Sequence, residues 1–194
     1  MFRWMALINV VSVFAISFHY RRLARKAGET IARRREGLVF GLLRAVFALP
    51  LFAAVVAYLI HPPWMAWSEF WLPDWLRWLG VAIGLLAIPS AWWLFSNLGR
   101  NVSETVLTKA DHMLVTTGPY RWVRHPLYAT GGALLIAVGV MAANWFIIGL
   151  ATIVVVLMRV LVVPREEEAL IAKFGDDYRR YRQRTGGMFP WLIR

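Results

Sequence analysis

Five apolar runs, separated by polar segments, dominate the pattern of hydrophobic and polar positions along the chain. Each run approaches the roughly 20 residues that an α-helix needs to cross the hydrocarbon of a bilayer. A backbone within lipid must satisfy its own hydrogen bonds, so such runs form helices. The pattern therefore predicts an all-α integral membrane protein of about five transmembrane helices, at residues 3–18, 38–60, 76–95, 127–143 and 145–163.

The composition agrees with this pattern. Hydrophobic residues make up 59% of the 194 residues, and the mean hydropathy is +0.54. Cysteine is absent, which excludes disulfides, thiolate metal sites and cysteine nucleophiles, and we expect no metal site. The first run is followed directly by arginines and not by a small-residue cleavage pattern, which favours a retained signal anchor.

The net charge of +11 is distributed unevenly. Lys and Arg concentrate after the first run, after the third run and in the tail, whereas segment 61–74 and the turn at 143–144 contain none. Cytoplasmic loops carry the basic residues of membrane proteins, so we expect the N-terminus outside and the C-terminus in the cytoplasm, in a bacterial inner membrane. No nucleic-acid-binding module accompanies the charge, so the expected partner is the lipid bilayer and not nucleic acid.

The chain changes character at the end of the third run. We expect residues 1–96 to form N-terminal transmembrane helices and residues 97–194 to form a core with the candidate chemistry. Within this core, residues 102–107 and 113–116 have the composition of short strands.

The segment before the fourth run ends in turn and helix signals. Gly118-Pro119 is typical of a turn, and Pro126 suits the first position of a helix because its preset φ needs no amide donor. The free amides of this helix N-terminus, beside Arg124 and His125, would attract an anionic group such as a carboxylate.

The tail contains signals for two further helices. Pro164 and the three glutamates after it favour a helix N-terminus, Gly175 is placed to end that helix, and Asp176 is placed to cap the next. Taken alone, the tail predicts an amphipathic helix lying on the membrane surface. An unbroken helix would place one set of residues, spaced by four, three, four and three, on a single face: Glu167, Ile171, Phe174, Tyr178 and Tyr181.

Two groups of residues together carry a family signature. The first consists of Leu98-Gly99-Arg100-Asn101, Ser103, His112, Leu114, Gly118-Pro119-Tyr120 and Arg124-His125-Pro126-Leu127-Tyr128. The second consists of Glu166-Glu167, Leu170, Phe174-Gly175, Tyr178 and Tyr181. In combination they resemble the isoprenylcysteine carboxyl methyltransferase family, which extends to the phospholipid N-methyltransferases. The chain departs from the family pattern at Thr130, where the family has glycine.

The resemblance implies an S-adenosyl-L-methionine-dependent integral membrane methyltransferase that acts on a membrane lipid or a lipidated substrate. It places a cytoplasmic cofactor pocket between the 99–126 loop, the last helical hairpin and the C-terminal helices. The residues implied in cofactor binding are His112, Gly118, Pro119, Tyr120, Arg124, His125, Pro126, Tyr128, Gly131, Glu166, Glu167, Tyr178 and Tyr181.

Two residues are candidates for catalysis. If the methyl acceptor is a carboxylate, the cation of Arg159 would orient it; if it is an amine, Glu167 would take up its proton. Three glycines of the fourth run either leave room for an alkyl chain of the acceptor or serve tight helix packing: Gly131, Gly132 and Gly139.

Three alternatives stay open at this point. The acceptor could be a phospholipid amine. The enzyme could be an NADPH-dependent reductase of the sterol-reductase type, whose C-terminal region is similar. The chain could also be a non-catalytic membrane scaffold whose basic tail lies on anionic lipid. Binding of S-adenosylhomocysteine or of NADPH distinguishes these classes.

Overall fold

A computed structural model describes residues 1–27, 42, 44–99 and 113–190. These residues form helices and helical turns, and they contain isolated β-bridges but no strands. The all-α class is confirmed. The strand expected at residues 113–116 is wrong, because this segment has no regular secondary structure. Residues 102–107 lie outside the described part of the chain.

The helices and helical turns follow one another in the order α1 (Phe2–Ala27), η2 (Arg44–Ala48), α3 (Leu49–Ile60), η3 (Pro62–Ser68), α4 (Asp74–Leu98), η5 (Gly118–Arg121), α5 (Pro126–Ala142), α6 (Trp145–Leu157), η6 (Met158–Val162), α7 (Val163–Phe174) and α8 (Asp176–Arg184). The helix starting at Pro126 and the tight turn before Trp145 are as predicted.

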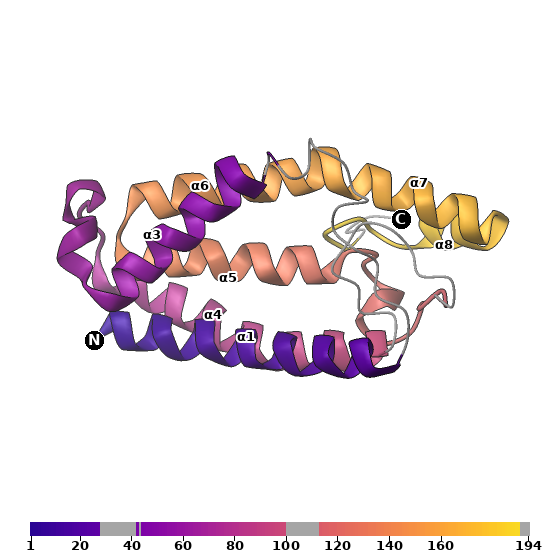
Figure 1. Cartoon of the computed structure of the whole chain (residues 1–194), viewed down its shortest axis with the longest axis horizontal. Helices are drawn as coiled ribbons and strands as arrows, with labels where there is room; N and C mark the ends of the chain where they lie inside the picture. The colour runs from indigo at the N-terminus through magenta and orange to yellow at the C-terminus, as the bar shows by residue number, and fades with distance from the viewer. Residues whose placement is uncertain (28–41, 43, 100–112, 191–194) are drawn as a thin grey trace.

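The long helices form an elongated bundle (Figure 1). α1 and α4 lie side by side, α5 packs against α4 and α6, and α3 crosses the bundle at an angle. The turn between α5 and α6 lies near η3 at one end, which we call the hairpin end. The end of α1, residues 113–125, α7 and α8 gather at the other end, which we call the site end.

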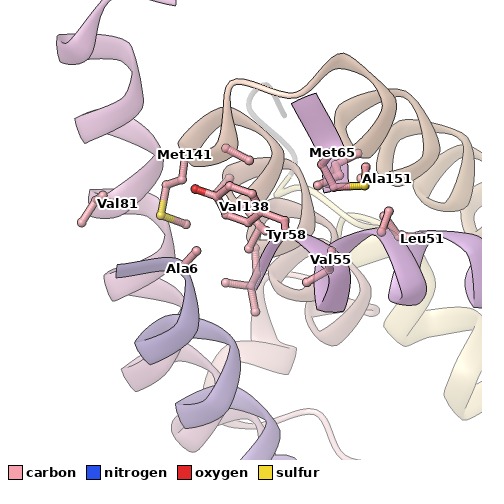
Figure 2. Packing of buried hydrophobic residues seen from close by; sticks show 14 of the residues in the cluster. Ala6, Leu51, Val55, Tyr58, Met65, Val81, Val138, Met141 and Ala151 are labelled. Carbon is pink, nitrogen blue, oxygen red and sulfur yellow. The ribbon is translucent and has the colours of Figure 1, made fainter. Parts of the chain in front are cut away.

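Small side chains and aliphatic residues form the interior of the bundle (Figure 2). One buried cluster joins three helices through Met141 of α5, Ala6 of α1 and Val81 of α4. Where a Cβ on Gly80 would sit, the carbonyl oxygen of Ala137 is only 3.0 Å away, so the missing side chain lets α4 and α5 approach closely.

Two helices are longer than their apolar runs. α1 continues beyond residue 18 because Tyr20 stacks on Phe95 of α4 and Ala24 is buried beside it. α6, η6 and α7 form one continuous helix of 30 residues, Trp145–Phe174. α7 begins at Val163 with Pro164 in its first turn, as expected, but it continues α6 and η6 without a break.

A π-helical segment precedes a proline in each of two helices. η2 lies just before Pro50, and η6 lies just before Pro164. A proline ring clashes with the carbonyl four residues earlier, and a π-helical insertion relieves that clash without ending the helix. This explains how the last long helix continues through Pro164 and brings the glutamates of α7 to the site end.

Within the described residues, three helices are long and apolar enough to cross a bilayer: Phe2–Lys26, Asp74–Leu98 and Trp145–Phe174. Two shorter apolar helices accompany them, Ala45–Ile60 and Pro126–Ala142. The apolar part of the last long helix ends near Val163, before its glutamates. A total of five spans stays a prediction.

Buried polar groups stabilise the hairpin end. Asn144 caps α6 by accepting a hydrogen bond from the amide of Ile147 at 3.0 Å. Its side-chain amide donates to the Met65 carbonyl at 3.1 Å and to Ser68 Oγ at 2.7 Å, and Ser68 Oγ donates to the Met65 carbonyl at 3.1 Å. Asn144 and Ser68 are fully buried, so η3 is fixed to the hairpin turn.

Arginines close two helix ends nearby. Arg3 donates from Nε to the Leu59 carbonyl and from Nη2 to the Ile60 carbonyl, both at 2.8 Å. Arg77 donates from Nε and Nη2 to the Met141 carbonyl at 3.0 and 2.9 Å. These guanidinium groups satisfy the last carbonyls of α3 and α5, which no helical amide can reach.

Candidate functional site

The turn before α5 requires a glycine. Gly118 has φ +58°, and a Cβ built there would lie 2.3 Å from Oδ1 of Asn97 at the end of α4. Both the backbone conformation and the space therefore exclude other residues. η5 follows, with Pro119 and Tyr120 buried, and brings the chain to His125, the N-cap of α5.

His125 lies between two neighbouring carboxylates of α7. Its Nε2 is 3.3 Å from Glu167 Oε1, and its Nδ1 is 3.5 Å from Glu166 Oε2. The imidazole is buried and stacks on the Tyr128 ring, whose hydroxyl donates to Glu166 Oε2 at 2.9 Å. Residues 38 to 43 positions apart in the sequence thus meet in one cluster.

Arg124 holds three parts of the site together. Its Nε donates to Glu167 Oε1 at 2.8 Å, and its Nη1 donates to the Arg182 carbonyl at 2.9 Å and to the Thr185 carbonyl. Arg182 also lies 3.7 Å from the other oxygen of Glu167. The guanidinium expected to bind a ligand carboxylate is largely engaged with α7 and the end of α8.

These contacts shift two pKa values in opposite directions. Burial alone would raise the pKa of Glu167, but hydrogen bonds and charge from His125 and Arg124 outweigh it and lower the pKa to about 2. Burial alone would lower the pKa of His125, but hydrogen bonds and charge from Glu166 and Glu167 outweigh it and raise the pKa. Glu167 is therefore a carboxylate at neutral pH, and the proton on His125 is held more firmly than usual.

Two tyrosines of α8 complete the cluster. The Tyr181 hydroxyl donates to the Tyr120 carbonyl at 2.6 Å, and burial raises its pKa to about 12. The Tyr178 ring lies 5.8 Å from the Tyr181 ring and is 1% exposed. α8 begins directly after Gly175, which has φ +56°; Asp176 is its first residue, pairs with Arg179 and does not form the expected cap.

The segment after α8, residues 185–190, lies across the start of α5, and we call it the C-terminal strap. The Gly186 carbonyl accepts from the Arg124 amide at 2.9 Å, and the Gly187 carbonyl accepts from the His125 amide at 3.0 Å. The Gly186 amide donates to the Trp122 carbonyl at 3.0 Å. The strap thus engages the two backbone amides directly before Pro126, the first residue of α5.

Sequence reasoning missed the strap. Its Thr185, Gly186 and Met188 are buried, although nothing in their hydropathy separates them from an ordinary tail. The one local signal is Gly186-Gly187 after a helix: a Cβ on Gly186 would lie 1.8 Å from the Phe189 carbonyl oxygen. That spacing requires glycine and indicates a tight turn.

Most of the predicted cofactor residues meet at the site end. The cluster unites residues of η5, α5, α7 and α8: Gly118, Pro119, Tyr120, Arg124, His125, Pro126, Tyr128, Glu166, Glu167, Tyr178 and Tyr181. His112 lies outside the described residues. Arg159 is exposed in η6 and contacts none of these side chains in the described part of the chain.

The three glycines of α5 differ in their surroundings. A Cβ on Gly132 would lie 2.6 Å from Val155 Cγ2, and one on Gly139 would lie 2.6 Å from Ile148 Cγ1. Both therefore serve tight packing of α5 against α6 and leave no room for an alkyl chain. A Cβ on Gly131 would meet nothing within 4 Å.

Comparison with protein families identifies the segment that contains most of the cluster. The model of the isoprenylcysteine carboxyl methyltransferase (ICMT) family matches residues 79–172, from α4 to α7. This segment is similar to the ICMT family. The resemblance inferred from the paired motifs is confirmed, and the match includes every cluster residue except those of α8 and the strap.

Two curated relatives are similar to the chain. The nickel-cobalt-cadmium resistance protein NccN of Alcaligenes xylosoxydans xylosoxydans is 26% identical over 78% of this chain. Methanethiol S-methyltransferase 1 of Bradyrhizobium diazoefficiens is 35% identical over 37% of this chain. The chain spans 64% of the first relative and 24% of the second, less than two thirds of either.

A solved structure has the same fold. It is that of the eukaryotic intramembrane Ras methyltransferase ICMT, with a TM-score of 0.57 and 24% sequence identity. The superposition covers 76% of this chain and 52% of the other. The ICMT-type membrane fold expected from the sequence is thereby confirmed.

Proposed function

We propose that the chain is an integral membrane methyltransferase that uses S-adenosyl-L-methionine and acts on a lipophilic acceptor. The observation that carries this proposal is the insertion of His125 between Glu166 and Glu167. The two halves of the ICMT motif lie about forty residues apart in the sequence, and this contact joins them in one buried cluster. The match of residues 79–172 to the ICMT family model supports the same reaction class.

The side chains of the cluster suit this cofactor. Glu166 can accept hydrogen bonds from an ammonium group or a ribose diol, and the rings of Tyr128 and Tyr178 can pack against adenine or face a sulfonium. Tyr178 also has a buried hydroxyl without a partner in the described residues. The cofactor supplies an electrophilic methyl group. Arg124, already bonded to Glu167 and the strap, would contribute chiefly by holding the glutamate in place.

Glu167 and Arg159 would have different tasks. With a pKa of about 2, Glu167 is a weak base, so we assign it the binding of positive charge in preference to the uptake of a proton. Arg159 is exposed about 12 Å along the helix from Glu167, at the ordinary helical rise. From there it would orient the headgroup of an acceptor in the membrane interface.

The acceptor would enter from the bilayer. We assign the site end, which has the basic segments, to the cytoplasm of a bacterial inner membrane, with the N-terminus outside. In the described residues, α7 and α8 are short and offer little structure outside the bundle that could enclose a polar acceptor. The relative named as a methanethiol methyltransferase shows that an acceptor series must also include a small thiol.

Binding of S-adenosylhomocysteine and of NADPH to the detergent-purified protein, measured by isothermal titration calorimetry, tests the reaction class. We expect saturable binding of S-adenosylhomocysteine and none of NADPH. Binding of NADPH alone would favour a reductase, and binding of neither would favour a scaffold.

Acceptors with one headgroup and increasing chain length then test lateral entry. Each methylene that becomes buried should lower the activation free energy that corresponds to kcat/KM by about 0.8 kcal/mol. The gain should stop when further methylenes no longer contact the protein. A rate that is independent of chain length, after correction for membrane partitioning, would contradict a lipophilic acceptor.

A further inference from the structure

The hydroxyl of Tyr178 is buried and has no hydrogen-bond partner among the described residues. The residue is 1% exposed. In residues 1–27, 42, 44–99 and 113–190, two buried side-chain atoms lack a partner, and the other is Oδ1 of Asn9 in α1. Most buried polar atoms in proteins are paired, so an unpaired hydroxyl inside a candidate site calls for an explanation.

Three hydroxyls of the same cluster are paired. Tyr181 donates to the Tyr120 carbonyl, Tyr128 donates to Glu166, and Thr185 donates to the Tyr181 carbonyl. A poorly satisfied environment therefore does not explain the isolation of Tyr178. Of the two tyrosine hydroxyls on α8, the one of Tyr178 lacks a partner in the described part of the chain and the one of Tyr181 has one.

The unpaired hydroxyl destabilises the free protein. Burying such a group without a hydrogen bond costs about 1–3 kcal/mol, and phenylalanine would fill nearly the same volume without that cost. A residue that lowers stability where a simple substitute would not is typical of a position retained for function.

The hydroxyl is a neutral donor in an environment that disfavours an anion. Burial, together with the negative charge of Glu167, raises the pKa of Tyr178, so it keeps its proton at neutral pH. The nearby positive charge of Arg124 is already paired with Glu167. An uncharged acceptor would suit this position better than a carboxylate, which would face the existing glutamates.

We propose that the Tyr178 hydroxyl donates a hydrogen bond to an uncharged acceptor atom of the bound cofactor, a ribose oxygen or an adenine nitrogen. This inference rests on the proposed function and makes the site more specific. Tyr178 lies in α8, beyond the segment matched by the family model.

The variant Tyr178→Phe tests the proposal through two measurements with opposite signs. Calorimetry should show S-adenosylhomocysteine binding about three- to tenfold more weakly than to wild type, because one neutral hydrogen bond is lost. Thermal unfolding of the free protein should occur at the same temperature or a few degrees higher, because the unpaired buried hydroxyl is gone.

Tyr181→Phe is the matched control, one helical turn away on the same helix. Its hydroxyl is bonded within the protein, so its loss should lower the unfolding temperature of the free protein. If Tyr178→Phe lowered that temperature as Tyr181→Phe does, the hydroxyl would have a structural role and the proposal would be wrong.

Analogues of S-adenosylhomocysteine that each lack one ribose or adenine acceptor identify the bonded atom. The analogue without that atom should bind Tyr178→Phe and wild type equally. If Tyr178→Phe weakened every analogue as much as the parent compound, the proposed acceptor would be wrong. Equal affinity of both proteins for S-adenosylhomocysteine refutes the Tyr178 contact alone, whereas no binding to wild type refutes the proposed function.

Discussion

Two clusters of buried polar groups, the Asn144–Ser68 network at the hairpin end and the His125 cluster at the site end, differ in kind. At the hairpin end, Asn144 and Ser68 are neutral and fully hydrogen-bonded. At the site end, charged groups are packed together and the Tyr178 hydroxyl has no partner in the described residues. A satisfied neutral network stabilises one structure, whereas a charged and incompletely bonded one retains the capacity to bind something else.

The comparison predicts that substitutions at the two ends affect different properties. Changes at the hairpin end should lower stability and leave ligand affinity unchanged. Changes at the site end should lower affinity, and their effect on stability should depend on which partner is left unpaired.

The largest effect is expected from Glu167→Gln and His125→Ala. Each removes a charge-assisted hydrogen bond from a partly buried cluster, at a cost of about 1.5–3 kcal/mol, or roughly ten- to a hundredfold in affinity for S-adenosylhomocysteine. Glu168→Gln is the control, because Glu168 is exposed. Calorimetry on all three variants checks this, and wild-type affinity in both site variants would remove these residues from the binding site.

A smaller effect, on stability, is expected from Asn144→Ala. It removes the cap of α6 and two hydrogen bonds to the η3 segment, which should destabilise the protein by about 2–3 kcal/mol. Thr152→Ala is the control, since its hydroxyl is exposed and bonds only to its own helix. Thermal unfolding measures the loss, and a reduced affinity for S-adenosylhomocysteine would show that the two ends are coupled.

Sequence periodicity could predict the helices but not how far they extend. Hydropathy located every apolar run, because lipid selects apolar side chains directly. It ended the first helix at residue 18, since it could not see that Tyr20 packs on Phe95. It also ended the last apolar run at residue 163, where a local π-helical insertion joins that run to α7 in one continuous helix.

The sequence could predict which residues form the candidate site, but it could not predict all the contacts that join them. The paired motifs identified His125, Glu166 and Glu167, because their spacing is characteristic of the family. The role of Arg124 as an anchor for the strap could not be inferred, since it depends on main-chain carbonyls of Arg182 and Thr185. Any residue type can supply such carbonyls, so side-chain patterns do not reveal them.

The charged cluster should give the free protein a stability maximum in mildly acidic solution. The pKa of Glu167 is lowered from 4.5 to about 2, so its contribution is complete above pH 4.5 and is lost as the pH falls toward 2. The pKa of His125 is raised above 6.5, so its contribution is complete below pH 6.5 and is lost as the pH rises through the raised value.

Thermal unfolding as a function of pH checks both losses of stability, which form the acid limb and the alkaline limb of the stability curve. Glu167→Gln should flatten the acid limb, and His125→Gln should flatten the alkaline limb. The Asn144 network contains no titratable side chain, so Asn144→Ala should shift the whole curve down without changing its shape. A wild-type curve without either limb would contradict the pairing of His125 with the two glutamates.

The smallest expected effect concerns Gly131, which separates packing from ligand contact within α5. A Cβ there meets nothing within 4 Å, so Gly131→Ala should leave the free protein unchanged or stabilise it by about 0.5–1 kcal/mol through reduced backbone entropy. Gly132→Ala, one residue along, places its Cβ 2.6 Å from Val155 and should destabilise. If the predicted role of Gly131 in cofactor binding is correct, Gly131→Ala should weaken S-adenosylhomocysteine despite its intact stability. Unchanged affinity in a folded Gly131→Ala protein would limit the cofactor site to the cluster around His125 and remove the helix face of Gly131 from it.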